Sequence, residues 1–368
     1  MANHRFLILD GLRGIGAMII AVHHTGAYWH FQFPRSYLAV DLFFLLSGFV
    51  LAHVHDEKLR DGRCSARDFL VLRLIRLLPD YWLSVLVSAF ALLTYVAATD
   101  QATVGYGAAA LAILMSLFLL PSVLPERNNL FPLDGPVWSL FYTLIVNAVY
   151  AACNRFLTPR ALAALVLVTG AACSFAVAVH GNMDVGAQAS LASAGAALCR
   201  ASFGFFWGLA LFRNPSLASR KLTRFLPPWS AFAILVAAVC IPGFGVLDPV
   251  IDIFVVVCIF PNIIAVATKP LNEGVARRAA PVLLALGAAS YPLYLMHKPL
   301  GEFVARVLGD RLAGTAPWSG VALFAGLFLF CVWLERRVDI PLRKFLTHRL
   351  VGARRPAASA QVAKPGVG

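Results

Sequence analysis

Apolar runs long enough to cross a lipid bilayer recur from the start of this sequence almost to its end. Eleven of them lie at residues 7–28, 37–55, 78–98, 105–120, 136–153, 160–180, 193–212, 228–243, 248–267, 280–298 and 317–335. About 20 apolar residues cross the hydrocarbon core as one helix. Of the 368 residues, 60% are hydrophobic and only 13% are charged, against about 25% charged in soluble domains. The sequence therefore predicts an all-α, polytopic membrane bundle and excludes a soluble enzyme on a single anchor.

The positive charges predict how the chain is threaded. Lys and Arg gather in residues 56–76, 213–224 and 269–278 and in the stretch from Arg336 onward, and such segments favour the cytoplasm. If all eleven runs crossed, the first two of these segments would face opposite sides. The short run at 105–120 is therefore expected to be re-entrant or interfacial, which leaves ten spans and both termini in the cytoplasm. The net charge of +13 is attributed to topology and to anionic lipid headgroups, and not to nucleic-acid binding.

The chain divides into a membrane domain over residues 1–345 and a tail over 346–368. The tail is basic and then rich in Ala, Pro and Gly, a composition typical of disorder. The N-terminus lacks the short apolar region and cleavage site of a signal peptide, so the first run is expected to remain as a helix. The seven Cys form no CxxC pair, and we expect small core residues with no disulfide framework and no metal site.

Polar residues interrupt the first run, "LDGLRGIGAMIIAVHH". Arg13 and His24 are eleven residues apart, which on a helix is about 16 Å of rise and a turn of only about 20° from the same face. They therefore share one face, with Arg13 toward the cytoplasm, whereas His23 points about 100° away, toward lipid or headgroups. The alternative is that Arg13 extends to the headgroups and that His24 is an ordinary helix-end histidine.

The second run, "YLAVDLFFLLSGFVLAHVH", carries Asp41 and Ser47. It enters from outside, so Asp41 is expected at a depth similar to that of His24. A carboxylate beside an imidazole would select its tautomer and raise its basicity. The alternatives are an interfacial helix cap for Asp41 and close helix packing for Ser47 and Gly48.

Two further stretches complete the set of candidate residues. In "RDFLVLRLIRLLPDYW", Arg73 and Arg76 are one turn apart just before the third run. They are either a positive-inside anchor or a phosphate clamp on the cytoplasmic side, since the guanidinium fork matches phosphate oxygens. In "SYPLYLMHKPL", His297 lies at the outer end of its run, on the same side as His24. Histidines on the outer side and an arginine pair inside suggest a donor that enters from one face and an acceptor that enters from the other.

The ordered set of motifs resembles the acyltransferase-3 family of integral membrane acyltransferases. It consists of Arg13 and His24 with ten residues between them, "VDLFFLLSGFVLA", "RLIRLLPDYW", "WSL" with Trp138 and Ser139, "SYPLYLMH" and "DIPLRKFL". The resemblance implies an acyl-CoA donor, usually acetyl-CoA, transfer to a hydroxyl of a sugar, and essential roles for Arg13 and His24. It also implies that the arginines after the second helix hold the donor, and that the protein lies in a bacterial inner membrane. No segment similar to the SGNH-type hydrolase of some members follows, so a stand-alone form is expected.

One position departs from the family pattern, which is usually WSLxxE. Thr143 stands where the Glu is expected, and Thr cannot ionise. Either that Glu is dispensable, or Asp134 in the preceding turn partly replaces it, or the protein is impaired.

The sequence thus predicts a membrane O-acyltransferase in which His24 removes the proton of the acceptor hydroxyl and Asp41 or another polar group orients it. Arg73 and Arg76 would hold the CoA phosphates, and Arg13 would stabilise negative charge on the thioester side. Direct transfer and a covalent intermediate on His24 or Ser47 both remain open. The expected partners are acyl-CoA, a glycan acceptor and membrane lipids, with no resident cofactor and no nucleic acid. The rival functions are a transporter or flippase of a lipid-linked sugar and a catalytically impaired scaffold.

Overall fold

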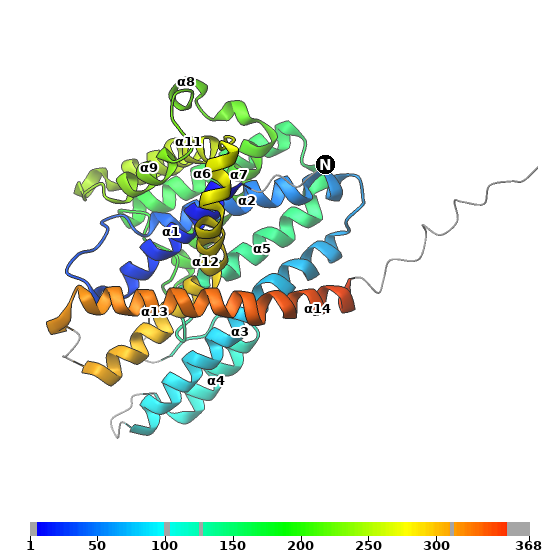
Figure 1. Cartoon of the computed structure of the whole chain (residues 1–368). Coiled ribbons are helices and arrows are strands. Elements are labelled where there is room, and N and C mark those ends of the chain that lie inside the picture. Colours follow the sequence, from blue (N-terminus) through cyan, green and yellow to red (C-terminus); the bar gives the residue numbers. More distant parts are fainter. Residues whose placement is uncertain (1–5, 99–103, 125–127, 310–312, 352–368) are drawn as a thin grey trace, which may run out of the picture.

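The computed structural model describes residues 6–98, 104–124, 128–309 and 313–351, which form helices and connecting turns without a strand (Figure 1). In this described part of the chain, nine helical segments are long and apolar enough to cross a membrane. The predicted all-α, polytopic membrane bundle is confirmed.

The helices follow the apolar runs, with several boundaries displaced. They are α1 Leu7–His24, α2 Leu38–Arg60, α3 Ala66–Ala98, α4 Tyr106–Leu117, α5 Val137–Cys153, α6 Pro159–His180, α7 Leu191–Arg213, α8 Arg220–Thr223, α9 Ser230–Val239, α10 Asp248–Phe254, α11 Phe260–Ala267, α12 Glu273–Leu308, α13 Trp318–Leu334 and α14 Ile340–Leu350. Single π-helical turns, Val255–Ile259 and Glu335–Asp339, join α10 to α11 and α13 to α14.

Helix α1 packs closely along α12, although nearly the whole chain separates them. A Cβ atom added to Gly14 would lie 2.6 Å from the Cβ of Leu286, so only glycine permits this approach of the two helices. At the other end of the pair, His24 contacts His297. The two helices therefore run in the same direction, and their shared face carries both histidines to one end of the bundle.

Glycines also bring α2 against α7. A Cβ on Gly48 would lie 1.9 Å from the carbonyl oxygen of Phe205, and one on Gly208 would lie 2.0 Å from that of Leu45. Both distances are far below van der Waals contact, so any larger residue would push the helices apart. Close helix packing, one of the two interpretations of the Ser47–Gly48 pair, therefore applies to Gly48.

Helix α9 decides the number of crossings. Its ten residues are only about 15 Å long, which is half of a usual span. The carbonyl of its last residue, Val239, accepts a hydrogen bond at 3.0 Å from the amide of Arg35, a residue that also contacts Asp248 at the start of α10. At the other end, Lys269, which follows α11, donates to the carbonyl of Leu226, just before α9, at 2.8 Å. Helix α9 therefore runs antiparallel to α10–α11, and ten passes result only if it is counted as a short crossing.

Helices α4, α3 and α14 bear directly on the predicted threading, the arginine pair and the tail. Helix α4, at 105–120, has only 12 residues, as expected of a segment too short to cross. Helix α3 begins at Ala66, so Arg73 and Arg76 lie within it and not before it. Helix α14 continues to Leu350, into the stretch assigned to the tail, and residues 352–368 of that tail lie outside the described residues.

Candidate functional site

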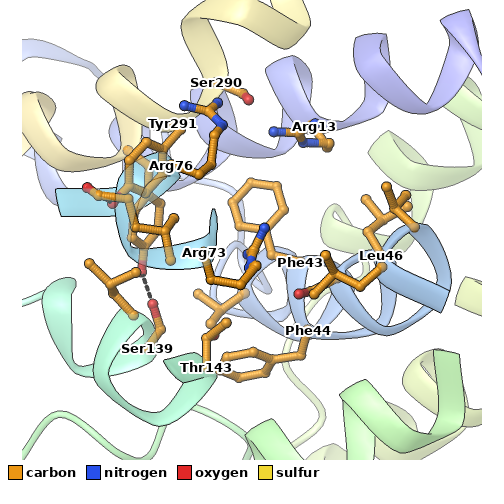
Figure 2. Close-up of a pocket in the computed structure, with 17 residues that line it drawn as sticks. Arg13, Phe43, Phe44, Leu46, Arg73, Arg76, Ser139, Thr143, Ser290 and Tyr291 are labelled. Atoms are coloured by element: carbon orange, nitrogen blue, oxygen red, sulfur yellow. Dashed lines mark hydrogen bonds between the residues drawn. The ribbon is translucent and has the colours of Figure 1, made fainter. Parts of the chain in front are cut away.

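A cavity of about 270 Å³ lies inside the bundle between α1, α2, α3, α5 and α12 (Figure 2). Its polar wall residues are Arg13, Ser47, Arg73, Arg76, Ser139, Thr143, Ser290, Tyr291 and Tyr294, and the rest of its wall is formed by Val, Leu and Phe side chains. An apolar cavity with a few convergent polar groups is the usual form of a small-molecule site. Five of the predicted site residues lie on this wall.

Three arginines give the cavity a positive charge, and Figure 2 shows Arg13, Arg73 and Arg76 around it. Arg13 forms an ion pair with Asp10, one turn earlier in α1, at 3.6 Å. Arg73 has no acidic partner within 4.0 Å in the described part of the chain, and its buried Nε atom makes no hydrogen bond there. A buried cation without a counter-ion is costly. An anionic ligand would therefore gain the most binding free energy from contact with Arg73.

Arg76 is held in place by its neighbours. Its Nη1 atom lies 3.1 Å from a carboxylate oxygen of Asp339 and 3.7 Å from one of Glu335. Its guanidinium group also stacks over the Tyr291 ring, 5.4 Å from the ring centre. Arg73 and Arg76 thus face one cavity from adjacent turns of α3, and Arg76 is fixed whereas Arg73 is unpaired.

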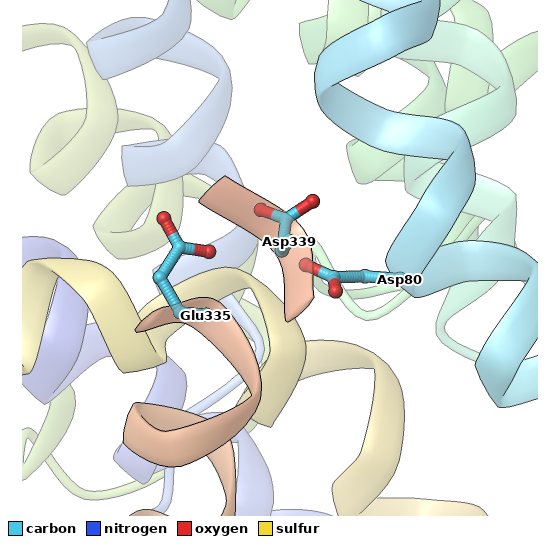
Figure 3. A group of neighbouring side chains, drawn as sticks. All are labelled: Asp80, Glu335 and Asp339. Carbon is cyan, nitrogen blue, oxygen red and sulfur yellow. The ribbon is translucent and has the colours of Figure 1, made fainter. Parts of the chain in front are cut away.

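Asp80, Glu335 and Asp339 form a buried acidic group with metal-ligand spacing (Figure 3). One ligand atom from each lies within 4.8 Å of the others. Arg343 contacts both Glu335 and Asp339, and Arg76 contacts the same two residues. Two guanidinium groups therefore neutralise most of the negative charge that would attract a metal ion, and the group serves to hold the two arginines.

At the other end of the bundle, His24 and His297 contact each other directly. His24 Nδ1 lies 3.0 Å from His297 Nε2 and 3.1 Å from the Ile20 carbonyl, and His297 Nδ1 lies 3.0 Å from the Leu293 carbonyl. Carbonyls only accept hydrogen bonds, so this network assigns the proton of neutral His297 to Nδ1 and leaves Nε2 as an acceptor. His24 then donates from Nδ1, and its Nε2 atom carries a free lone pair.

The two histidines differ in exposure. His297 is fully buried, whereas His24 is exposed at the end of α1. The buried ring can therefore orient the exposed one, and only His24 is open to a substrate. His23 does not face lipid as predicted, because the chain after α1 folds back over it and Ser36 Oγ lies 2.8 Å from its Nδ1 atom.

Tyr294 connects the cavity to the histidines. It lines the cavity, its hydroxyl lies 2.6 Å from Ser139 Oγ, and its ring centre is 6.1 Å from that of His297. Tyr291, Tyr294 and His297 are spaced by three residues, which places them on one face of α12. This spacing was visible in "SYPLYLMH", but the sequence prediction took only His297 from it.

Asp41 does not orient His24, contrary to the prediction. It is buried, and its two carboxylate oxygens accept hydrogen bonds from Arg200 Nε at 3.1 Å and Nη2 at 2.7 Å. The guanidinium group of Arg200 lies 5.2 Å from the centre of the Trp138 ring. Asp41 lies on the face of α2 that packs against α7, so its partner is the arginine of that helix, and Trp138 covers the pair instead of lining the cavity.

Ser47 and Thr143 both lie on the cavity wall, and the buried Ser47 hydroxyl has no hydrogen-bond partner among the described residues. Asp134 is not on this wall and therefore does not replace a glutamate at position 143.

Asp134, just before α5, instead accepts a hydrogen bond from the Ser84 hydroxyl at 3.0 Å. The same Ser84 hydroxyl lies 3.0 Å from the Leu295 carbonyl. This carbonyl has no helical hydrogen-bond donor, because the residue four positions later is Pro299, which lacks a backbone N–H. Burial raises the pKa of the Asp134 carboxyl to about 7.

Comparison with known proteins identifies a family and two relatives. Residues 6–336 match a family described as an acyltransferase domain. The chain is 39% identical over 183 residues to a protein of Rhizobium radiobacter named "Protein 2 in picA locus", which covers 46% of this chain and 95% of that protein. It is 27% identical over 112 residues to the exopolysaccharide production protein ExoZ of Rhizobium meliloti. This match covers 30% of this chain and 32% of that protein. No solved structure matches.

Proposed function

This chain belongs to the acyltransferase domain family, and from that premise we propose that it transfers an acyl group from acyl-CoA to a hydroxyl of a carbohydrate or glycan. Acetyl-CoA is the expected donor. The printed name of one relative, an exopolysaccharide production protein, supports a polysaccharide acceptor. The observation that carries the proposal is the exposed His24 with a free Nε2 atom, oriented by the buried His297 at 3.0 Å.

In the proposed reaction, His24 Nε2 takes the proton of the acceptor hydroxyl. The hydroxyl oxygen forms the new ester bond with the acyl carbon while the carbon–sulfur bond of the thioester breaks. The CoA thiolate takes up the proton from His24 and leaves as the thiol, so atoms and charge balance. We favour direct transfer over an acyl-Ser47 intermediate, because no base contacts the Ser47 hydroxyl in the described structure.

The arginines would hold the donor. Arg73, which has no counter-ion, and Arg76 would bind phosphate oxygens of CoA, since charge-assisted hydrogen bonds to phosphate are among the strongest in proteins. Arg13 lies on the same cavity wall and would offset negative charge on the thioester side. Tyr294 and Ser139, between the arginines and the histidines, would border the path of the acyl group.

The proposed orientation places the arginine end of the cavity on the cytoplasmic side of a bacterial inner membrane, where acyl-CoA is found. Clustered Lys and Arg in the loops support it, as does an even number of passes with α9 included. Labelling of single cysteines in whole cells tests this. A cysteine at Asn128 should react with an impermeant reagent and one at Arg63 should not; the reverse pattern would invert the orientation.

The function itself is tested with the purified chain in lipid nanodiscs, acetyl-CoA and an exopolysaccharide preparation. Release of CoA thiol that depends on the glycan, with ester formation on the glycan, is the expected result. A flippase would instead move a labelled lipid-linked sugar across vesicle membranes without thiol release. A non-catalytic scaffold, which Thr143 in place of the usual Glu favours, would bind the synthesis machinery but release no thiol with any glycan.

A further inference from the structure

The cavity is too small for a whole acyl-CoA. Its volume of about 270 Å³ lies just below the range of about 300–1,000 Å³ typical of pockets for drug-sized ligands, and acyl-CoA is larger than such ligands. The acyl group and the narrow pantetheine arm fit such a space, whereas the nucleotide end of CoA requires a second one.

A second cleft, of about 470 Å³, lies on the other side of the same α3 turns. Helix α3 contributes Leu72, Ile75 and Arg76 to it, and α14 contributes Arg343, Lys344 and His348. Arg76 lines both this α3–α14 cleft and the cavity. A ligand with a bulky anionic end and a thin arm can therefore occupy both spaces only by passing Arg76.

The cleft presents fixed and unpaired positive groups. Asp339 contacts both Arg76 and Arg343 and so holds the two guanidinium groups side by side (Figure 3 shows the carboxylates). Lys344, in contrast, has no acidic partner within 4.0 Å among the described residues. The apolar side chains of Leu72 and Ile75 form the α3 wall. An apolar wall beside cationic groups suits a base with phosphates attached.

We propose that the α3–α14 cleft binds the nucleotide end of acyl-CoA, an adenosine with a 3′-phosphate and a 5′-diphosphate. The adenine lies on Leu72 and Ile75, and the 3′-phosphate contacts Arg343 and Lys344. The 5′-diphosphate contacts Arg76 and Arg73, where the pantetheine arm enters the cavity. This inference rests on the proposed function, because it assigns a place to part of the proposed donor.

The first test measures binding alone. Adenosine 3′,5′-bisphosphate is titrated calorimetrically into the full chain in nanodiscs of zwitterionic lipid. The variant Lys344→Glu should weaken binding at least about fivefold, because it replaces an attractive charge by a repulsive one. Arg349→Glu is the matched control: it lies on the same helix, is exposed, makes the same change in net charge and does not line the cleft. Equal weakening in both variants, or none in either, overturns the proposal.

The second test uses two donors. With acetyl-CoA, Lys344→Glu should raise KM at least about fivefold, while with acetyl-pantetheine, which has no nucleotide, it should match the unmutated protein. An equal effect on both donors contradicts the assignment. If neither donor supports transfer but the bisphosphate binds in a Lys344-dependent way, the nucleotide cleft stands and the proposed function fails.

The third test separates the nucleotide from lipid headgroups, which also carry phosphate. The binding experiment is repeated in nanodiscs with anionic lipid. A nucleotide site keeps the difference between Lys344→Glu and Arg349→Glu, with both affinities lowered by surface charge. If anionic lipid abolishes bisphosphate binding in the unmutated protein, the cleft binds headgroups and the proposal is wrong.

Discussion

His24 Nδ1 and His297 Nε2 lie 3.0 Å apart, although 273 residues separate them in the chain. The buried histidine accepts a hydrogen bond from the exposed one and thereby leaves the outer nitrogen of His24 unprotonated. Orientation of a reactive imidazole by a second polar group is usually performed by a carboxylate. Here Asp41, the carboxylate that the sequence suggests for this role, is paired with Arg200, and an imidazole fulfils the role.

Replacement of His24 tests the role of the base. His24→Gln should lower acyl transfer by about 10²–10⁴-fold, because an amide can hydrogen-bond but cannot accept the proton. His23→Gln, which loses the contacts of its ring with Ser36 and with the His24 ring, should stay within a few-fold of the unmutated rate. Initial rates at matched amounts of protein in membranes measure both. An active His24→Gln protein would remove His24 from the chemistry.

Replacement of His297 tests the positioning role. His297→Leu removes the acceptor for His24 Nδ1 and should lower kcat by about 10–100-fold with little change in KM. His297→Gln retains an acceptor oxygen and should recover part of the lost kcat. An equal loss of kcat in the two variants, or a change in KM without a change in kcat, would contradict a role that acts through His24.

Arg73 is expected to bind donor phosphate. Arg73→Met should raise the KM for acetyl-CoA about tenfold or more, since hydrogen bonds to a charged group are lost, and Arg73→Lys should recover only part of it because a point charge replaces the guanidinium fork. Arg67→Met, on an exposed position of the same helix, is the control. Because Arg73 has no counter-ion, the melting temperature of Arg73→Met should not fall; a lower one would indicate a structural anchor.

Asp41 is expected to support the fold and not the chemistry. Asp41→Leu leaves Arg200 buried and unpaired and should destabilise the protein by about 3–5 kcal/mol. The double variant Asp41→Leu, Arg200→Met removes both charges and should recover stability and transfer activity. Thermal unfolding in detergent and initial rates measure this. A stable but inactive double variant would return Asp41 to the catalytic residues.

Asp134 should make stability depend on pH. Its carboxyl titrates near 3.8 when unfolded and near 7 when buried, so the folded protein holds the proton more tightly. The stabilising effect of protonated Asp134 is therefore complete below about pH 4 and is lost as the pH rises through about 7. Relative to Asp134→Asn, the unmutated protein should lose roughly 4 kcal/mol at most over this range. A difference that does not vary with pH would rule out the raised pKa.

Much of the architecture follows from the sequence, because membrane helices are signalled by local composition. The apolar runs predicted the helical bundle, the short α4 and the common face of Arg13 and His24, since all of these depend only on residues close together in the chain. Helix ends were less predictable. Helix α3 starts at Ala66 and α14 ends at Leu350, because polar residues continue a helix wherever packing or ion pairs satisfy them.

The partners of the polar residues were decided by the tertiary structure. Asp41 and His24 are expected at similar depth, but depth does not say which face of α2 meets which helix. Glycines at positions 48 and 208 bring α2 against α7, so Asp41 meets Arg200, and Gly14 brings α1 against α12, so His24 meets His297. Helical periodicity orients a side chain within its own helix, whereas the contact across helices depends on which small residues let two backbones approach.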